Sequence, residues 1–399
     1  GRPGELWRQH GLVLSDYVRR LARIMNGYGS HMGALRVRRL MAGLLGVVVV
    51  LGAVPPESPI ADAAMREDLA QVRTFIEEGL DVNAAQGDGM TALHWAAETG
   101  NVEIAEALIA AGASTDGVTR NGGYTPLHLA ARTGGPALVQ RLIEAGADLQ
   151  VTTASGRTSA LHLAAAAGGH EAVGILLTAG ARVDVRESEW GQTPLMFAAS
   201  FGRTAVVRRL LEHGADPSIT TRVIDIPAQA GVDDAAGDVR NEVLDGFRAE
   251  HSAGNLNWRP TPSQVRTAVR AAQDVQRTLG DAEEKEEEFD PQSEEFLGYT
   301  DLVGTQGGLT ALLHAAREGH VETAIALLDG GADVNQVSAG DHTSPMLMAT
   351  INGHFDLALL LMDRGADPRV QSDAGAAPLF VALNTHWAPK ARYPQQQAY

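Results

Sequence analysis

The chain has 399 residues, with 32 basic and 49 acidic side chains for a formal net charge of −17, and it contains no cysteine. The lack of cysteine excludes disulfides, thiolate zinc sites and a cysteine nucleophile. The acidic balance argues against nucleic acid as a partner, because binding phosphates requires a clustered positive surface. Only 5% of the residues are aromatic while 44 are glycine, so the composition favours thin layers over a thick globular core.

The first 53 residues differ from the rest in charge, because they carry a net +6 and leave −23 for the remainder. An arginine cluster that ends at Arg39 precedes a 15-residue apolar run from Leu40 to Val54. This run fits the apolar region of a secretory signal and is shorter than the ~20 residues that span a bilayer. We therefore predict a signal peptide at 32–53, with an uncleaved membrane anchor as the alternative. We assign no structure or function to the leader 1–31.

A short motif recurs along the rest of the chain at a fixed spacing. It starts with Thr or Ser, and successive starts lie 34 residues apart except across one long gap. The starts are Thr91, Thr125, Ser159 and Thr193, then Thr310 and Ser344 after the gap. Each copy continues with a pair of small residues and a Leu/Ile pair, and it closes with Gly-Ala-Asp or a near variant. The closing glycines are Gly112, Gly146, Gly180, Gly214, Gly331 and Gly365. Such a fixed period indicates stacked repeats.

Each copy of the motif predicts a pair of short helices. The opening Thr or Ser is a helix N-cap, and Pro in the next place is favoured as the first helical residue. A glycine such as Gly100 or Gly319 ends the first helix, and Asn101 or His320 opens the second. The closing glycine then ends the second helix in the left-handed conformation. One such unit is too thin to fold alone, so the expected fold class is an all-α solenoid of stacked helix–turn–helix units.

This pattern resembles the ankyrin repeat family, over about five units in 58–217 and two to three units in 305–383. The resemblance implies β-turn fingers between units, a protein partner, and no cofactor or metal. It also implies that His94, His128 and His162 hydrogen-bond the opening Thr or Ser and neighbouring backbone. The chain has no metalloprotease, nucleophile-elbow, phosphate-loop or dinucleotide-binding motif, so we expect no enzyme.

The two ends of the array depart from the repeat. Ser58 opens a worn copy of the motif 33 residues before Thr91, and cleavage inside that copy would remove the N-terminal cap. We therefore expect signal cleavage near Ala53. The last copy, at Ala377, has a first helix and lacks a second one. Either a non-repeat tail covers this last helix or, as we favour, the chain is a fragment of a longer array. Segment 384–399 is then the start of a non-repeat tail or of a second insertion.

A long insertion interrupts the array at 218–304, where a finger should join two repeats. Apolar residues at helical spacing predict helices at 238–251 and 264–279, the second one capped by Pro262 and Ser263. The run 281–295 that follows has nine acidic residues and one Lys. We interpret the helices as a lid packed on the array and the acidic run as a solvated linker. Attraction of a basic partner is the alternative, since the run matches no ordered calcium loop.

The resemblance also implies which residues line a concave groove. They are the turn residues before each opening Thr or Ser and the two residues after each small pair. The candidate partner-binding residues are Met90, Glu98, Thr99, Tyr124, Arg132, Thr133, Trp190, Gln192, Phe201, Arg317 and Glu318. Tyr124 is the main candidate, because rigid aromatic side chains dominate interface hot spots. Trp190 and Phe201 flank the insertion, so they either contact the partner or are covered by the lid.

These observations together predict an exported, monomeric, non-enzymatic ankyrin array of bacterial type that binds a protein partner. Its expected location is the periplasm or the extracellular space, and nucleic acid is not expected as a partner. The alternative is a structural scaffold tethered to the inner membrane by an uncleaved helix at 40–54. A third class, an enzyme that uses the insertion, would need a clustered acid/base site. The insertion offers only scattered candidates: Asp225, Asp233, Asp234 and His251.

Overall fold

The computed structural model describes residues 58–251, 258–280 and 304–387. Contacts divide the chain into two units, 1–57 and 58–399, and every described residue belongs to the second unit. The predicted leader and signal peptide lie outside the described residues, and so do the acidic run and segment 388–399. Within the described ranges, no helix is both long enough and apolar enough to cross a bilayer.

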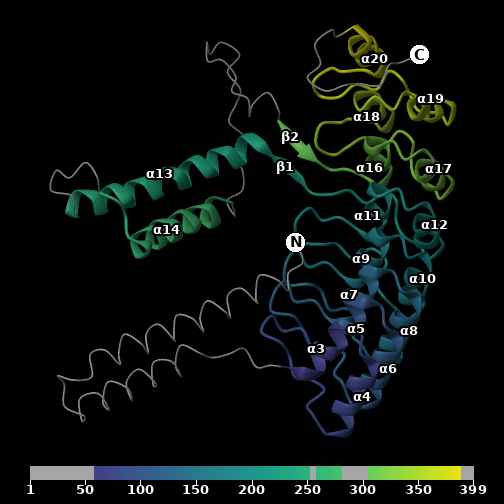
Figure 1. Ribbon diagram of the computed structural model, residues 1–399. Coiled ribbons are helices and arrows are strands. Elements are labelled where there is room, and N and C mark those ends of the chain that lie inside the picture. Colours follow the sequence, from purple (N-terminus) through teal and green to yellow (C-terminus); the bar gives the residue numbers. More distant parts are fainter. Residues whose placement is uncertain (1–57, 252–257, 281–303, 388–399) are drawn as a thin grey trace. The chain divides into compact units, whose positions relative to one another are not determined.

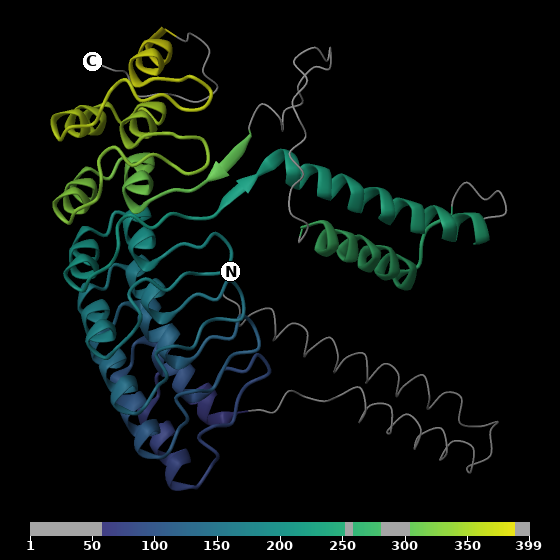
Figure 2. The same cartoon turned by 180° about the vertical axis from the view of Figure 1, so that it is seen from behind.

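The repeat units stack as two columns of short helices, with loops that project as fingers (Figures 1 and 2). The inner column holds the first helix of each unit: α3 (Pro59–Met65), α5 (Ala92–Thr99), α7 (Pro126–Thr133), α9 (Ala160–Ala167), α11 (Pro194–Ser200), α16 (Ala311–Glu318), α18 (Pro345–Ile351) and α20 (Pro378–Trp387). The outer column holds the second helices: α4 (Leu69–Glu77), α6 (Val102–Ala110), α8 (Pro136–Glu144), α10 (His170–Thr178), α12 (Thr204–Glu212), α17 (Val321–Asp329) and α19 (Phe355–Asp363). Each inner helix packs against the next along the column, so the predicted all-α solenoid is confirmed.

The opening Thr or Ser of each unit caps its inner helix, as the sequence predicts. Thr91 Oγ1 accepts the backbone N–H of His94 at 3.4 Å, and the backbone N–H of Thr91 donates to His94 Nδ1 at 3.2 Å. This reciprocal bonding satisfies two backbone groups that a helix start leaves open, and such caps each contribute about 1 kcal/mol. The capping residues are Ser58, Thr91, Thr125, Ser159, Thr193, Thr310 and Ser344.

The closing glycines end the outer helices in the left-handed region. All six have φ between 82° and 99°, where a side chain would strain the backbone. At Gly146 an added Cβ would meet no atom within 4 Å, so the requirement for glycine there comes from the backbone alone. The predicted left-handed helix ends are therefore confirmed.

The core between the two columns is thin and consists mainly of alanine and leucine. Ala96 and Ala97 of α5 and Leu108 of α6 are fully buried, and they belong to one apolar cluster that runs from Ile60 to Ala366. Across the insertion, α11 packs against α16 and α12 packs against α17. The repeats before and after the insertion therefore stack as ordinary neighbours.

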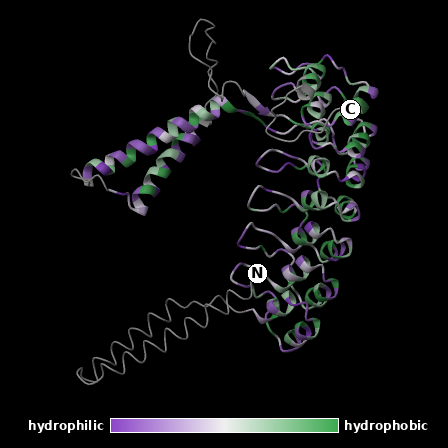
Figure 3. Ribbon diagram, turned by 45° about the horizontal axis from the view of Figure 1, so that its top comes forward, coloured by the Kyte–Doolittle hydropathy of each residue, from purple (hydrophilic) through white to green (hydrophobic). Residues whose placement is uncertain are grey.

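Two helices of the insertion pack against each other: α13 (Ile226–His251) and α14 (Pro262–Gly280). Ala236 and Ala268 are buried, at 3% and 0% exposure. Hydrophobic and hydrophilic residues alternate along both helices (Figure 3). The prediction started these helices too late. α13 starts at Ile226 rather than 238, and Thr261 caps α14, because its Oγ1 accepts the N–H of Gln264. The lid on the array stays a prediction.

The insertion leaves and rejoins the array through one interrupted finger. Its two arms form the antiparallel strands β1 (Val223–Asp225) and β2 (Thr305–Gly307), with Val223 opposite Gly307. At the base, the N–H of Leu309 donates to Thr221 Oγ1 at 2.8 Å. The same bond closes an uninterrupted finger, where the N–H of Tyr124 donates to Thr119 Oγ1 at 3.0 Å. The interrupted finger thus keeps the base of an ordinary one.

Backbone hydrogen bonds between neighbouring fingers show at which residues the insertion begins and ends. The N–H of Arg222 donates to the carbonyl of Trp190 at 2.8 Å, as the N–H of Arg120 donates to the carbonyl of Asp88 three finger pairs earlier. The finger therefore continues through Arg222 and resumes at Gly307. The insertion occupies 223–306, a few residues later at both ends than the predicted 218–304.

Candidate partner-binding groove

A groove runs between the fingers and the inner column. Four inner helices contribute the residue four places after their cap, and residues at the tips and bases of the fingers supply the opposite wall. These inner-helix residues are Trp95, Leu129, His314 and Met348, and the same place holds Leu163 in α9 and Phe197 in α11. Two pockets lie in this groove, and both include residues that the sequence nominated.

The first pocket, here called the Tyr124 pocket, has a volume of about 260 Å³ and lies between the second and third units. The structure brings four nominated residues to it: Met90, Glu98, Tyr124 and Arg132. The Arg132 guanidinium lies 5.5 Å from the centre of the Tyr124 ring and forms an ion pair with Glu98 of the preceding inner helix. An aromatic ring and a charge pair therefore share one small cavity.

Thr99 and Thr133 lie at the ends of α5 and α7 and do not line either pocket. Both are exposed, and each hydroxyl donates to a carbonyl of its own helix, Thr99 to Trp95 at 3.0 Å and Thr133 to Ala130 at 2.8 Å. Their position leaves them at the margin of the groove.

The second pocket, here called the His314 pocket, has a volume of about 580 Å³ and lies beside the interrupted finger. Trp190, Gln192 and Arg317 of the nominated set line it, together with Gln306, His314 and Met348 among others. Trp190 is 44% exposed. Glu318 lies next to the pocket and pairs with Arg317 at 2.9 Å. Phe201 is 55% exposed and lies outside the pocket lining.

A buried carboxylate holds the finger that carries Trp190. Glu187 is 6% exposed, and its Oε1 accepts the N–H groups of Trp190 at 2.7 Å and of Gln192 at 2.8 Å. This finger therefore has a fixed shape, and the exposed indole is presented to the groove by a rigid support.

Sequence reasoning missed His314, although a signal for it was present. In three units the histidine stands three places after the cap, whereas the unit of Thr310 has Leu313 in that place and a histidine one place later. His314 is 2% exposed, and neither ring nitrogen has a hydrogen-bonding partner among the residues that the structure describes. Burial lowers the pKa of His314 to about 3, with a smaller contribution from Arg317, so the ring is neutral at neutral pH.

Comparison with known proteins identifies the family. A family model of ankyrin repeats in three copies matches residues 60–153, 134–221 and 293–372, which is more than half of the chain. The chain belongs to the ankyrin repeat family. Among solved structures, the human ASB11 ankyrin repeat domain is similar, with 25% identity and a TM-score of 0.49, covering 76% of this chain and 98% of that one. No curated protein matches the chain.

Two motif histidines of the ankyrin array, His94 and His162, join neighbouring units. His94 Nδ1 lies 2.7 Å from Thr91 Oγ1, and its Nε2 bonds the carbonyls of Gly117 at 3.1 Å and Tyr124 at 3.0 Å. His162 Nε2 bonds the carbonyl of Gln192 at 3.0 Å in the same way. Burial lowers the pKa of His162, as well as that of His128, to about 4. His94 and His162 are therefore structural bridges, whereas His128 bonds Thr125 of its own unit through Nδ1 and its Nε2 has no partner among the described residues.

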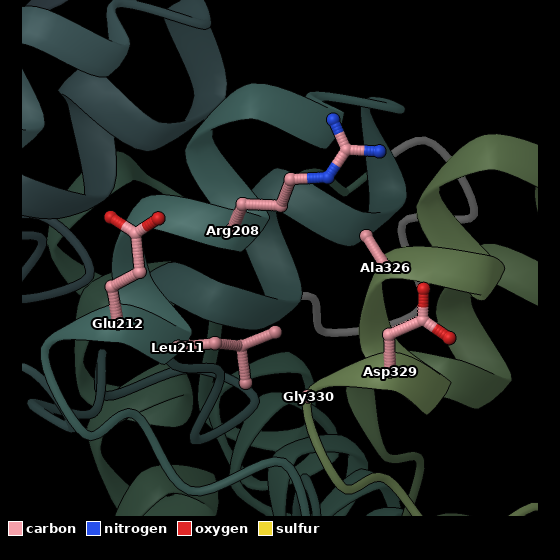
Figure 4. A pocket seen from close by; sticks show the side chains of 6 residues that line it. All are labelled: Arg208, Leu211, Glu212, Ala326, Asp329 and Gly330. Atoms are coloured by element: carbon pink, nitrogen blue, oxygen red, sulfur yellow. The ribbon is translucent and has the colours of Figure 1, made fainter.

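A third pocket lies in the outer column, between α12 and α17 (Figure 4). It has a volume of about 350 Å³ and is lined by Arg208, Leu211, Glu212, Ala326, Asp329 and Gly330. The charged ends of Arg208, Glu212 and Asp329 point apart from one another (Figure 4). Across the described part of the chain, no three His, Asp or Glu side chains gather in a way that could hold a metal ion.

Proposed function

We propose that this ankyrin array binds a protein partner through its groove, with the Tyr124 pocket as the main contact and without catalysis. Ankyrin repeats are generally protein–protein interaction modules, and members of the family are typically non-enzymatic. The extended surface that stacked repeats create serves such binding, because each unit adds one finger and one inner-helix face to it.

The arrangement around Tyr124 is the observation that carries this proposal. Its ring is half-buried, lies edge-on to the His128 ring with centres 6.2 Å apart, and is stacked by Arg132. A ring held in this way loses little conformational entropy on binding. Tyrosine and arginine are also the residue types enriched in interface hot spots, where truncation costs about 2 kcal/mol or more.

The charge of the array supports a partner with a basic contact surface. Residues after position 53 carry a net −23, and complementary charge accelerates association. The acidic run 281–295 lies outside the described residues, and it remains part of this charge whatever its arrangement.

We infer that the protein is exported and works as a monomer in the periplasm or outside the cell. The basic residues ahead of the apolar run at 40–54 support this inference. The same run also favours a second candidate function, a scaffold that stays tethered to the inner membrane. Membrane fractionation combined with N-terminal sequencing of the mature protein separates the two. A soluble form that starts near Ala53 supports export, whereas an intact N-terminus in the membrane fraction supports the tether.

Two arginines of the same repeat unit provide a matched pair for testing the groove. Arg132 on α7 pairs with Glu98, and Arg141 on α8 pairs with Glu106 at 2.8 Å. Both side chains are about half exposed, at 45% and 51%, and both ion pairs join neighbouring units. Only Arg132 belongs to the groove, because Arg141 lies in the outer column.

The experiment uses affinity capture with the wild-type mature protein to isolate the partner, followed by titration of that partner against Arg132→Glu and Arg141→Glu. We expect Arg132→Glu to weaken binding about 30-fold, which corresponds to about 2 kcal/mol. Arg141→Glu should leave the affinity within about twofold, and the two variants should unfold at similar temperatures. Equal loss of affinity in both variants would contradict binding through the groove.

A further inference from the structure

The inner helix α16 departs from its neighbours at one groove position. In the same place other units carry Leu129 and Leu163, which complete the apolar surface without polar atoms. Here the place is taken by His314, which is almost fully buried and whose two ring nitrogens have no partner among the described residues. By contrast, both nitrogens of His94 and His162 are bound. An unpartnered buried polar ring is costly to the fold, so folding does not account for it.

The surroundings of His314 provide space and one half-exposed cation. The pocket that it borders, at about 580 Å³, exceeds the Tyr124 pocket in volume, and the strand β2 of the interrupted finger forms part of its wall. Arg317 is half-exposed at this pocket, and its Nε donates to the carboxylate of Glu318 at 2.9 Å. Asp341 also lines it, but its carboxylate accepts the hydroxyls of Ser338 at 2.5 Å and Thr343 at 2.7 Å. The carboxylate is therefore engaged by its own finger.

This chemistry restricts what can bind. A neutral imidazole has one N–H donor and one acceptor nitrogen, and it can exchange the two roles between its nitrogens. A charged group buried against such a ring would pay for desolvation without a compensating opposite charge. An uncharged side chain that both donates and accepts suits the ring in either form. Carboxamides and hydroxyls meet this condition. Arg317 has the charge to pair with a carboxylate one or two residues away in the bound segment. The exposed Trp190 offers an apolar surface to the methylene groups of that segment's side chains.

We propose that the His314 pocket is a specificity subsite that accepts an extended segment of the protein partner, with a carboxamide or hydroxyl side chain at His314 and a carboxylate at Arg317. The inference rests on the proposed function, since it names what one part of the groove reads. It also assigns a role to the interrupted finger. By supplying β2 as a wall, the insertion point makes this recess of the groove larger than the Tyr124 pocket at an uninterrupted finger.

The first test separates a binding role from a structural one by stability. His314→Leu installs the residue that equivalent units already carry, so it removes two unpartnered nitrogens and keeps the apolar contacts. We expect the melting temperature of His314→Leu to rise above that of the wild type. His162→Leu is the matched control, because it removes a ring whose nitrogens are bound, and its melting temperature should fall. A fall for His314→Leu as well would overturn the inference, since the ring would then support the fold.

The second test measures recognition with a phage-displayed library of random 12-residue peptides, selected separately on the wild type, His314→Leu and Tyr124→Ala. The wild type should enrich peptides with Asn, Gln, Ser or Thr within two residues of Asp or Glu. For a selected peptide, His314→Leu should weaken binding tenfold or more. Replacing the amide or hydroxyl residue of that peptide by Ala should cost the wild type a similar factor and cost His314→Leu almost nothing. In the same way, replacing the acidic residue of the peptide by Ala should weaken binding to the wild type and have almost no effect on binding to Arg317→Gln.

The outcomes distinguish this inference from the proposed function. Peptides that lose affinity with Tyr124→Ala but bind the wild type and His314→Leu equally would leave groove binding intact and refute the subsite. Peptides without the polar and acidic pair would refute it as well. If the library yields no binder and the captured partner binds Arg132→Glu as tightly as the wild type, both proposals are refuted, binding through the groove and the subsite within it.

Discussion

Removing residues 224–306 and replacing Val223 by Asn would restore an uninterrupted finger in this ankyrin array. The joined finger would read Thr-Arg-Asn-Gly-Gly from Thr221 onward, which is the sequence that starts at Thr119 in an ordinary finger. The distance from Thr193 to Thr310 would fall from 117 residues to 34, the spacing of the other units. The change therefore tests whether the insertion is an appended element or a structural part of the solenoid.

The expected gain in stability follows from loop closure. The bond between Leu309 and Thr221 closes a loop of 88 residues, whereas the equivalent bond between Tyr124 and Thr119 closes one of five. Closure entropy grows as (3/2)RT ln n, so shortening the loop favours the fold by about 2.5 kcal/mol at most. Structure inside the insertion reduces this figure, and loss of the short β1–β2 pairing opposes it. We therefore expect the shortened array to be as stable as the full chain or up to ~2 kcal/mol more stable.

Urea denaturation followed by circular dichroism at 222 nm measures this prediction. A second variant, lacking 218–304, is the matched control, because it removes almost the same number of residues but also deletes Thr221 and Arg222. That variant loses the bonds at the base of the finger and leaves Thr193 and Thr310 only 30 residues apart, so it should be less stable. If the first variant fails to fold, or if both variants are equally stable, the placement of the insertion at the finger tip is wrong.

Three further predictions concern the array and its N-terminus. Gly146→Val should lower the free energy of unfolding by about 1–3 kcal/mol, because φ is 93° there, and an unchanged melting temperature would contradict the left-handed helix end. Unfolded histidines bind a proton near pH 6.5, whereas His128 and His162 do so only near pH 4 in the fold. Stability should therefore fall as the pH drops between these values, by about 3 kcal/mol per histidine at completion, and urea titrations of His162→Gln should show a shallower fall. Residues 54–399 should stay soluble without the N-terminal segment, and complete recovery in the membrane fraction would refute export.

Local features of the fold were predictable from the sequence because their physics is local. An N-cap needs only a hydroxyl and an N–H three residues later, as at Thr91. A helix end at Gly146 needs only the absence of a side chain, since an added Cβ would meet nothing nearby. Repetition then multiplied these weak signals, because each one recurs in register across units. The stacking of units across the insertion followed from the same register.

The bounds of the insertion were not predictable in this way, because they depend on bonds between distant residues. The bond from Leu309 to Thr221 and the bond from Arg222 to Trp190 fix where the finger stops and resumes. Apolar periodicity carries no information about either bond. Only the split Thr-Arg and Gly-Gly pairs at 221–222 and 307–308, compared with the finger at 119–123, indicate the position. The start of α13 was missed for a related reason, since its first turns continue directly from β1 and have weak periodicity.

The candidate site shows the same division between local and non-local information. The register of the repeat nominated Tyr124, Glu98 and Arg132 one by one, and their union in a single pocket depends on the close stacking of α5 against α7. His314 was passed over because the motif contains histidines that serve the fold, and one more histidine in a repeat resembled another of these. At the motif position, three places after the cap, a histidine such as His162 is hydrogen-bonded. His314 stands one place later, where the residue lines the groove. In a solenoid with such strict phase, a one-residue departure from the pattern is therefore a stronger indication of function than an unusual residue type.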